Sequence, residues 1–402
     1  MGSATVRLHD PDVYEQGVPH EFFDELRRAD PVHWHPEDAR GRGFWAVTRY
    51  QDVVAVSRDP DTFSSYRGTA MLADFDDEVI EMQRAMMVNM DPPSHTRQRN
   101  LVNRGFTPRM VGKLEDHIRE VCHELVDDVA RQPQADFVHD IAAQLPLAVI
   151  AELMGVPGED RERLYDWSNR MIGFDDPEFQ VEGSDGAAAA TEIFAYAGEL
   201  AQRRRAEPRD DIVTKMIQPD SNGDVLQDLE FNMFFVLLIV AGNETTRNAA
   251  SGGMLALLEH PEQWQRIQQD RALVPSAVEE ILRWVTPVMD FRRTATRDTV
   301  IGDQPVSAGD KVILFYPSAN RDESVFDNPH TFDITREPNP HITFGGGGPH
   351  FCLGAHLARL ELRVLFETLA ERLPGIRLAG PVRRLRSNFI NGIKEMPVQL
   401  WT

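Results

Sequence analysis

Cysteine is scarce in this chain of 402 residues, which contains only Cys122 and Cys352. Two cysteines that lie far apart in the sequence do not form a disulfide framework, so a reducing cytoplasmic compartment is expected. Iron–sulfur clusters and structural zinc sites need several thiolates, which this chain cannot supply. The scarcity therefore excludes disulfide-rich scaffolds and thiolate clusters, and the role of each single cysteine has to be argued separately.

Long apolar runs and an excess of basic residues are also missing. The longest apolar run, Met233 to Ala241, is far too short to span a bilayer, and residues 1–10 lack the apolar core of a signal peptide. The formal net charge of −22 disfavours nucleic acid or an anionic membrane as a bulk partner. These absences predict a soluble cytoplasmic protein without a membrane span.

What is present is mainly helical periodicity. Apolar residues recur with helical spacing in four stretches: residues 108–131, 137–155, 159–172 and 274–285. The longest such pattern, 227–259, is apolar on nearly every face in its middle, which is typical of a buried central helix. Strand-like stretches are few, and we expect Thr299–Pro305 and Lys311–Tyr316 to form a hairpin. Without repeats or an obvious linker, the chain is predicted to form one domain over residues 1–402, mostly α with a small β-rich region.

The first chemical feature is a glycine-rich loop that ends in a cysteine. Four consecutive glycines, Gly345 to Gly348, precede His350 and Cys352, and an amphipathic helical pattern follows. Four glycines in a row cannot form the interior of a strand or helix, but they let a backbone approach a ligand closely. The thiol therefore lies just ahead of a helix N-terminus, where unpaired amides and the helix dipole favour a thiolate.

Several roles compete for Cys352. A buried structural cysteine is the commonest fate of a lone thiol, but a core cysteine rarely follows four glycines. A hydrolytic nucleophile needs a histidine base, and His350, two residues away on the loop, is poorly placed for this, although His356 is also near. A single thiolate as the only protein ligand is the arrangement of haem-thiolate iron, either in a sensor protein or in an enzyme that cleaves O2.

The second feature lies in the middle of the long apolar pattern, where Glu244 and Thr245 follow Gly242. A carboxylate in a buried helix is costly unless it is paired or functional, and a glycine weakens the helix where a small ligand could widen it. A threonine back-bond with the glutamate at a wet edge would also explain the pair. In proton delivery, Thr245 would hold bound oxygen and a water, and Glu244 would connect them to bulk protons.

Two further patterns are weak when each is taken alone. Glu280 and Arg283 place an acid and a guanidinium on one helix face, upstream of the cysteine loop. The same spacing occurs elsewhere, mostly as predicted solvated pairs: Glu25/Arg28, Glu37/Arg40, Glu81/Arg84 and Glu244/Arg247. The other pattern is a set of basic residues that would supply cations for an anionic prosthetic group: His95, Arg99, Arg293 and His350.

In their order and spacing these motifs resemble the cytochrome P450 family of haem-thiolate monooxygenases, over nearly the whole chain. The resemblance implies the mostly helical P450 fold and haem b as the cofactor. It also implies that Cys352 is the axial iron ligand and that Glu244 and Thr245 are the catalytic pair. The other residues implied at the haem, four of them as propionate binders, are His95, Arg99, Arg293, His350, Ala241, Phe344 and Gly354. Glu280 and Arg283 are implied as a fold-stabilising pair.

One departure concerns the aromatic residue of the cysteine loop. The family usually has it seven residues before the cysteine, where this chain has Gly345, and Phe344 lies one residue further out. A similar glycine-rich loop occurs in bacterial members that hydroxylate methyl-branched lipids and sterol side chains. We therefore expect insertion of one oxygen atom from O2 into a methyl-branched lipid, fatty acid or steroid side chain, with a terpenoid or polyketide of secondary metabolism as the alternative.

The remaining expectations concern the substrate pocket and the redox partners. Segments equivalent to the family's substrate contacts predict these pocket residues: Met86, Met87, Val88, Met171, Phe174, Val236, Val240, Val288, Met289, Phe291, Phe389 and Ile390. They favour a hydrophobic substrate. Because no flavin or iron–sulfur domain is present, the resemblance implies electrons from NAD(P)H through a ferredoxin and ferredoxin reductase. The arginines that could dock an acidic ferredoxin, or could simply belong to a mixed-charge surface, are Arg97, Arg99, Arg104, Arg359 and Arg363.

Overall fold

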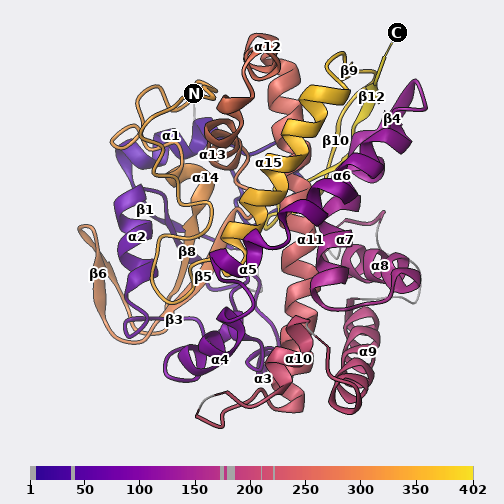
Figure 1. Ribbon diagram of the computed structural model, residues 1–402. Coiled ribbons are helices and arrows are strands. Elements are labelled where there is room, and N and C mark those ends of the chain that lie inside the picture. The colour runs from indigo at the N-terminus through magenta and orange to yellow at the C-terminus, as the bar shows by residue number, and fades with distance from the viewer. Residues whose placement is uncertain are drawn as a thin grey trace.

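The computed structural model describes residues 6–37, 41–172, 176–178, 186–209, 211–220 and 222–401. Its helices gather around one long central helix, and the largest sheet lies to one side of that helix (Figure 1). Within the described residues, no helix combines the length and the apolar character that crossing a bilayer requires. The predicted fold class, mostly α with small β regions, is confirmed.

The central helix α11 spans Asp228–Glu259. A capping box begins it, because the Gln227 side chain accepts from the backbone N–H of Glu230 while the Glu230 side chain accepts from the N–H of Gln227. The helix ends at His260, where Pro261 begins the helix α12 (Pro261–Gln269). Buried residues occur on all sides of α11, as the apolar pattern over 227–259 predicts.

Two of the predicted helices are each divided in the structure. The 108–131 stretch forms α5 (Pro108–Gly112) and α6 (Glu115–Val129), and the 137–155 stretch forms η3 (Phe137–Ala142) and α7 (Gln144–Leu153). Pro146 explains the second division, because it has no N–H to donate to the carbonyl of Ala142. The remaining helices are η1 (Pro11–Gln16), α1 (His20–Ala29), α2 (Tyr50–Arg58), α3 (Asp77–Gln83), η2 (Met87–Asn89), α4 (Ser94–Asn103), η4 (Gly158–Asp160), α8 (Arg161–Ile172), α9 (Gly186–Ala206), α10 (Ile212–Ile217), η6 (Arg271–Leu273), α13 (Val274–Val285), α14 (Tyr316–Ala319) and α15 (Ala355–Arg372).

The largest sheet has five strands in the order β1-β2-β8-β5-β3. Their bounds are β1 (Val32–His35), β2 (Phe44–Val47), β8 (Lys311–Phe315), β5 (Asp290–Ala295) and β3 (Phe63–Ser64). The β2–β8 pair is parallel and the other pairs are antiparallel. All five residues of β8 are buried, which is typical of a strand covered on both faces.

The predicted hairpin between Thr299–Pro305 and Lys311–Tyr316 is wrong. Instead, β6 (Thr299–Ile301) pairs with β7 (Gln304–Val306) across a two-residue turn in which Gly302 has a φ of +57°. Strand β8 pairs with β5 and β2, because its buried residues require the interior of the sheet. The other strands are β4 (Gln134–Asp136), β9 (Arg377–Leu378), β10 (Arg383–Arg384), β11 (Ile393–Glu395) and β12 (Pro397–Gln399).

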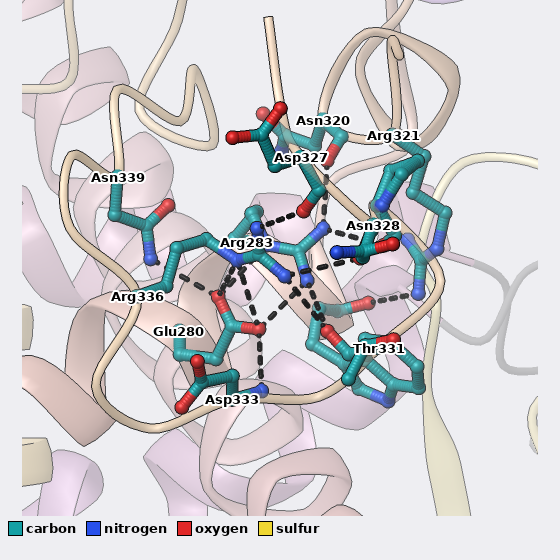
Figure 2. Close-up of polar contacts among 12 residues, drawn as sticks. Glu280, Arg283, Asn320, Arg321, Asp327, Asn328, Thr331, Asp333, Arg336 and Asn339 are labelled. Carbon is teal, nitrogen blue, oxygen red and sulfur yellow. Dashed lines mark hydrogen bonds and ion pairs between the residues drawn. The ribbon is translucent and has the colours of Figure 1, made fainter.

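Glu280 and Arg283 of α13 form a fully buried ion pair (Figure 2). The Arg283 Nε and Nη2 atoms donate to Glu280 Oε2 and Oε1 at 2.8 and 2.7 Å. Arg283 Nη1 also donates to the backbone carbonyls of Asn320 and Pro329, at 3.0 and 2.9 Å. The guanidinium thus joins a helix to an irregular segment that lies some forty residues further along the chain.

The Glu280 carboxylate accepts several hydrogen bonds besides those from Arg283 (Figure 2). Its carboxylate accepts from Arg336 Nε at 3.1 Å, from the backbone N–H of Asp333 at 3.0 Å and from Asn339 Nδ2 at 3.1 Å. Because the segment from 320 to 339 has almost no regular secondary structure, these bonds replace the ladder that a helix or strand would provide. The pair therefore organises the long connection that leads to the cysteine loop.

The other copies of this spacing differ in burial. In the Glu81–Arg84 pair, the Glu81 side chain is exposed, whereas that of Arg84 is 24% exposed and also contacts Tyr66. The Glu244–Arg247 pair is buried, so the prediction of a solvated pair is wrong there. The spacing is the same in both cases, and the difference lies in what packs over the helix.

Strand β5 carries a carboxyl group that is buried without a partner. Asp290 is 1% exposed, and neither of its side-chain oxygens has a hydrogen-bond partner among the described residues. Burial raises the pKa of this carboxyl well above its ordinary value. The folded protein thus keeps a proton on Asp290 that the unfolded chain releases above about pH 4.

We expect Asp290→Asn to stabilise the protein at neutral pH. Above about pH 4 the unfolded state binds fewer protons at this position than the folded state, so the wild type loses about 1.4 kcal/mol per pH unit until the folded-state pKa is reached. The gain of the variant should therefore grow from pH 4 towards neutral pH and disappear below pH 4. Chemical denaturation across this pH range measures it, with the exposed Asp61→Asn as the control. An equal gain at pH 3 and pH 7 would contradict the assignment.

Candidate functional site

A mostly apolar cavity of about 240 Å³ lies between α11, α15, β5 and the cysteine loop. Residues from all of these elements line it, and they include Cys352, Phe344 and Gly354 of the loop region. The cysteine loop and the middle of α11 therefore line the same cavity. Most of the candidate residues predicted from the cysteine and acid–alcohol motifs meet there.

The four glycines let the loop turn and pack closely. Gly345, Gly347 and Gly348 have φ values of +101°, +92° and +77°, a region that favours glycine. A Cβ at Gly348 would lie 2.4 Å from the carbonyl oxygen of Ser57, at the end of α2. The additional glycine is therefore accommodated against α2. Phe344 remains on the cavity wall, and its carbonyl accepts from the N–H of Cys352 at 2.9 Å.

The surroundings of Cys352 shift the pKa of its thiol in opposite directions. Cys352 is exposed to the open cavity. Desolvation by the surrounding protein raises the pKa of its thiol, while the backbone amide of Gly354 and the guanidiniums of Arg99 and Arg359 act in the other direction. The predicted helix start is present, since Gly354 caps α15, but desolvation outweighs its effect on the pKa in the protein alone. A bound cation is what would make the thiolate the stable form. The site therefore suits a metal ligand better than a free nucleophile.

The four predicted basic residues meet on the cavity wall, but they do not carry equal charge. The rings of His95 and His350 lie 4.3 Å apart, and burial lowers the pKa of His95 to about 4 and that of His350 well below its ordinary value. In the protein alone this favours the neutral form of both histidines at neutral pH, and an anion bound in the cavity would favour their protonated forms. Arg99 and Arg293 hold the positive charge, and neither makes an ion pair within the described residues.

These residues fit an anionic, iron-bearing prosthetic group. Arg293 is 5% exposed without a carboxylate partner, and the Nδ1 atom of His95 is buried without one in the described structure. A buried guanidinium of this kind calls for an anion. A Cβ at Gly354 would meet no atom within 4 Å, so the backbone beside Cys352 faces open space. Cationic donors for carboxylates and one thiolate for iron are the donor set of haem.

Thr245 lies on the cavity wall, where its hydroxyl donates to the carbonyl of Ala241 at 2.7 Å. Ala241 and Gly242 line the cavity as well. A Cβ at Gly242 would lie 2.5 Å from the Cδ1 atom of Ile150. The glycine thus permits close packing of α11 on α7, and the helix continues through it without interruption in this structure.

Glu244 does not line this cavity. It is fully buried, pairs with Arg247 and accepts from the Ser168 hydroxyl of α8 at 3.2 Å. Burial raises its pKa, and Arg247 and Ser168 oppose that effect. In this conformation the acid of the acid–alcohol pair is held by α8 and by its own helix, away from the hydroxyl that it is expected to serve.

The predicted substrate contacts divide into two groups. Met87, Val88, Val288 and Phe291 line the cavity. The other described candidates pack elsewhere: Val236 and Met289 are buried in the core, Val240, Phe389 and Ile390 form a small cluster beside Leu385, and Met86 and Met171 pack against the α9–α11 core. Phe174 lies outside the described residues.

Sequence reasoning missed several wall residues of α11. Phe234, Leu237 and Leu238 line the cavity with Ala241 and Thr245. These positions lie three to four residues apart, on one helix face. Counting back from Thr245 in helical steps would have found them. Val236 and Val240, which are predicted from a segment equivalent to the family's substrate contacts, do not line the cavity.

Comparison with known proteins agrees with this geometry. The family model named Cytochrome P450 matches residues 185–373. The steroid C26-monooxygenase of Rhodococcus jostii (strain RHA1) is 47% identical over 401 residues, which is 98% of this chain and 84% of the relative. The methyl-branched lipid omega-hydroxylase of Mycobacterium tuberculosis (strain ATCC 25618 / H37Rv) is 44% identical over 385 residues, 94% of this chain and 90% of the relative.

Solved structures resemble it over similar lengths. Mycobacterium marinum cytochrome P450 CYP268A2, in complex with pseudoionone, has a TM-score of 0.88 and 40% identity, and the match covers 94% of each chain. Bacillus megaterium CYP109E1 in complex with corticosterone has a TM-score of 0.84 and 31% identity, covering 96% of this chain and 98% of that one. Cys352, Arg99 and Arg293 line one cavity, and these similarities extend over nearly the whole chain. The chain therefore belongs to the cytochrome P450 family of haem-thiolate monooxygenases.

Proposed function

We propose that this P450 monooxygenase hydroxylates the end of a branched hydrocarbon chain, on a steroid side chain or a methyl-branched lipid. The observation that carries the proposal is that one apolar cavity is lined by Thr245, by the cysteine loop and by the apolar side chains of Met87, Val288 and Phe291. Such a wall binds hydrocarbon and excludes water. Relatives of 44–47% identity carry the names steroid C26-monooxygenase and methyl-branched lipid omega-hydroxylase, which favours this substrate class.

In the proposed mechanism, the residues of this chain hold the cofactor and manage protons. Cys352 would ligate the haem iron, and Arg99 and Arg293, together with His95 and His350, would hold its propionates. When bound, the haem supplies the reductive activation of O2 that inserts one oxygen atom into a C–H bond. The protein contributes orientation of the substrate, exclusion of water and supply of protons.

The Thr245 hydroxyl lies on the cavity wall and donates its proton to the Ala241 carbonyl. Its oxygen is therefore available to accept a hydrogen bond from a water or another proton donor in the cavity. Glu244 would connect this hydroxyl with bulk protons only after leaving Arg247 and Ser168. Rotation of the Glu244 side chain would break both contacts, since Arg247 belongs to the same helix and Ser168 of α8 contributes a single hydrogen bond.

The substrate proposal is tested with purified, haem-loaded protein. We expect a sterol with its full side chain, or a methyl-branched fatty acid, to change the haem spin state and to be hydroxylated at the chain end. The matched controls are the same steroid nucleus without the side chain and a straight-chain fatty acid of equal length. Turnover of terpenoids or polyketides alone would overturn the proposal in favour of the alternative.

We further propose that electrons arrive from a ferredoxin and its reductase. Four of the five arginines considered from sequence are neutralised locally: Arg97 by Asp224 and Glu230, Arg104 by Asp220, Arg359 by Glu279 and Arg363 by Glu115. The fifth, Arg99, lines the cavity. Docking would therefore rest on other cations near the cysteine loop.

Arg109 and Lys113, on and just after α5, make no ion pairs among the described residues. Val111 between them belongs to the same core cluster as Leu357 and Leu360 of α15, so α5 lies beside the helix that follows Cys352. We expect R109E/K113E to slow reduction by an acidic ferredoxin about tenfold at low salt and less at high salt. Stopped-flow reduction measures the rate, with the exposed Arg42→Glu as the control. An unchanged rate at every ionic strength would contradict docking here.

A further inference from the structure

One arginine of the segment that follows α14 is buried without a counterion. Arg321 is 3% exposed and makes no ion pair among the described residues. Its Nη2 atom donates to the carbonyl of Trp284 at 3.0 Å, and its guanidinium carbon lies 4.7 Å from the centroid of the Trp284 ring. Its Nη1 atom is buried and has no hydrogen-bond acceptor in the part of the chain that the structure describes.

The acids near Arg321 are already bound by other side chains. Glu280 and Asp24 are the two carboxylates close enough to influence its guanidinium (Figure 2). Their partners are Arg283 and Arg336 for Glu280, and Arg27 and His330 for Asp24. Burial and the neighbouring charge of Arg283 lower the pKa of Arg321 to about 9, so it is still a cation at neutral pH. A buried guanidinium of this kind calls for an anion that these carboxylates do not supply.

Helix α1 brings a histidine to the same region. His20, Asp24 and Arg27 lie at helical spacing on one face of α1. This face packs on the segment that carries Arg321, because the Ser318 carbonyl accepts from Arg27 Nη1 at 3.2 Å and from the N–H of Arg321 at 3.0 Å. The His20 Nδ1 atom is buried without a hydrogen-bond partner in the described structure. After burial, the charge of Arg321 is what lowers the pKa of His20 most, which agrees with this placement.

We propose that Arg321 and His20 form a binding site for a small inorganic anion, with chloride as the ligand. Arg321 Nη1 donates one hydrogen bond to the ion, and His20, as the neutral tautomer with the proton on Nδ1, donates a second. A monatomic anion suits two donors, whereas sulfate or phosphate brings several further oxygens that would need donors of their own. The bound ion neutralises the buried charge of Arg321.

This site is separate from the haem cavity, since neither Arg321 nor His20 lines that cavity. It joins α1 to the irregular segment from 320 to 339, which leads to the cysteine loop. A bound anion should therefore stabilise the fold and the retention of haem together. The proposal does not depend on which substrate the enzyme hydroxylates.

Anion binding is tested first on the haem-loaded wild type, without turnover. The midpoint of urea denaturation should rise with chloride and then level off, when sodium gluconate keeps the ionic strength constant. A hundredfold excess of chloride over its dissociation constant shifts the folding equilibrium about a hundredfold. In crystals grown with bromide, an anomalous peak should lie between Arg321 and His20. A stability that follows ionic strength alone, with no such peak, would overturn the proposal.

Variants then locate the ion. Arg321→Gln removes the charge and should abolish the chloride dependence, and His20→Phe removes one donor and should weaken the apparent chloride affinity about tenfold. Arg28→Gln, at an exposed position of α1, is the control and should behave as the wild type. Wild-type chloride dependence in Arg321→Gln would overturn the assignment. If that variant does not fold, His20→Phe decides, because an unchanged affinity there would overturn it equally.

Discussion

Replacing Arg283 with alanine should lower the free energy of unfolding by about 3–5 kcal/mol. The change leaves the Glu280 carboxylate fully buried with Arg336 as its remaining cationic partner, and it removes the donors to the Asn320 and Pro329 carbonyls. Because these bonds hold the segment that leads to the cysteine loop, loss of haem binding should accompany the loss of stability. Urea denaturation and the haem-to-protein absorbance ratio measure the two effects.

The chain offers a control with the same sequence spacing. Glu81 and Arg84 form an ion pair on and just after α3 in which the Glu81 carboxylate is exposed, so breaking the pair should change stability by only about 0–1 kcal/mol, although Arg84→Ala also removes a hydrogen bond to the Tyr66 carbonyl. A double variant, E280Q/R283M, removes both buried charges and should recover part of the loss, because no charge is then left uncompensated. Equal effects of Arg283→Ala and Arg84→Ala would refute the importance of burial.

Replacing Thr245 with alanine should uncouple electron consumption from product formation. The Thr245 hydroxyl is on the cavity wall, and alanine removes the group that would hold a proton or a water there. General acid–base groups contribute about 10²–10⁴-fold to rates, and a relay with alternative routes is expected to lose at least about tenfold in product per NAD(P)H. Simultaneous measurement of NAD(P)H consumption, hydroxylated product and hydrogen peroxide checks this.

Serine at position 245 is the matched control, because it keeps the hydroxyl and its bond to the Ala241 carbonyl while removing only a methyl group. Thr245→Ser should therefore retain most of the coupling, and its substrate-induced spin shift should match that of the wild type. If alanine and serine behaved alike, the hydroxyl would have no part in proton delivery, and the position would matter only for packing.

Local features were the most predictable part of this protein. The cysteine loop could be read because four glycines, a cysteine and a helical pattern follow one another directly, and the structure places Gly354 at the start of α15 as that order requires. The bounds of α11 agree with the predicted 227–259 pattern, which begins with the acidic Asp228 and Glu230 and ends before Pro261. Such signals act over a few residues, so they remain visible without knowledge of the fold.

Features that depend on distant partners were not predictable in this way. Glu81–Arg84 and Glu244–Arg247 have the same spacing, yet only the second is buried, because Ser168 and the rest of α8 cover it. Likewise, Val236 and Leu237 are adjacent and both apolar, but only Leu237 faces the cavity. The orientation of α11 about its own axis is decided by its packing against α7, α8 and α9, which no local pattern specifies.

The sequence by itself therefore determined the family, and the resemblance to that family predicts Cys352 as the thiolate ligand. Tertiary structure alone decided which acids line the cavity. Glu244 stands beside Thr245 in the chain but is turned into a buried pair, whereas Glu361 lies more than a hundred residues away and lines the cavity. The physical reason is that a helix side chain faces whatever its neighbours leave open, and only the packed arrangement of helices determines where that opening lies.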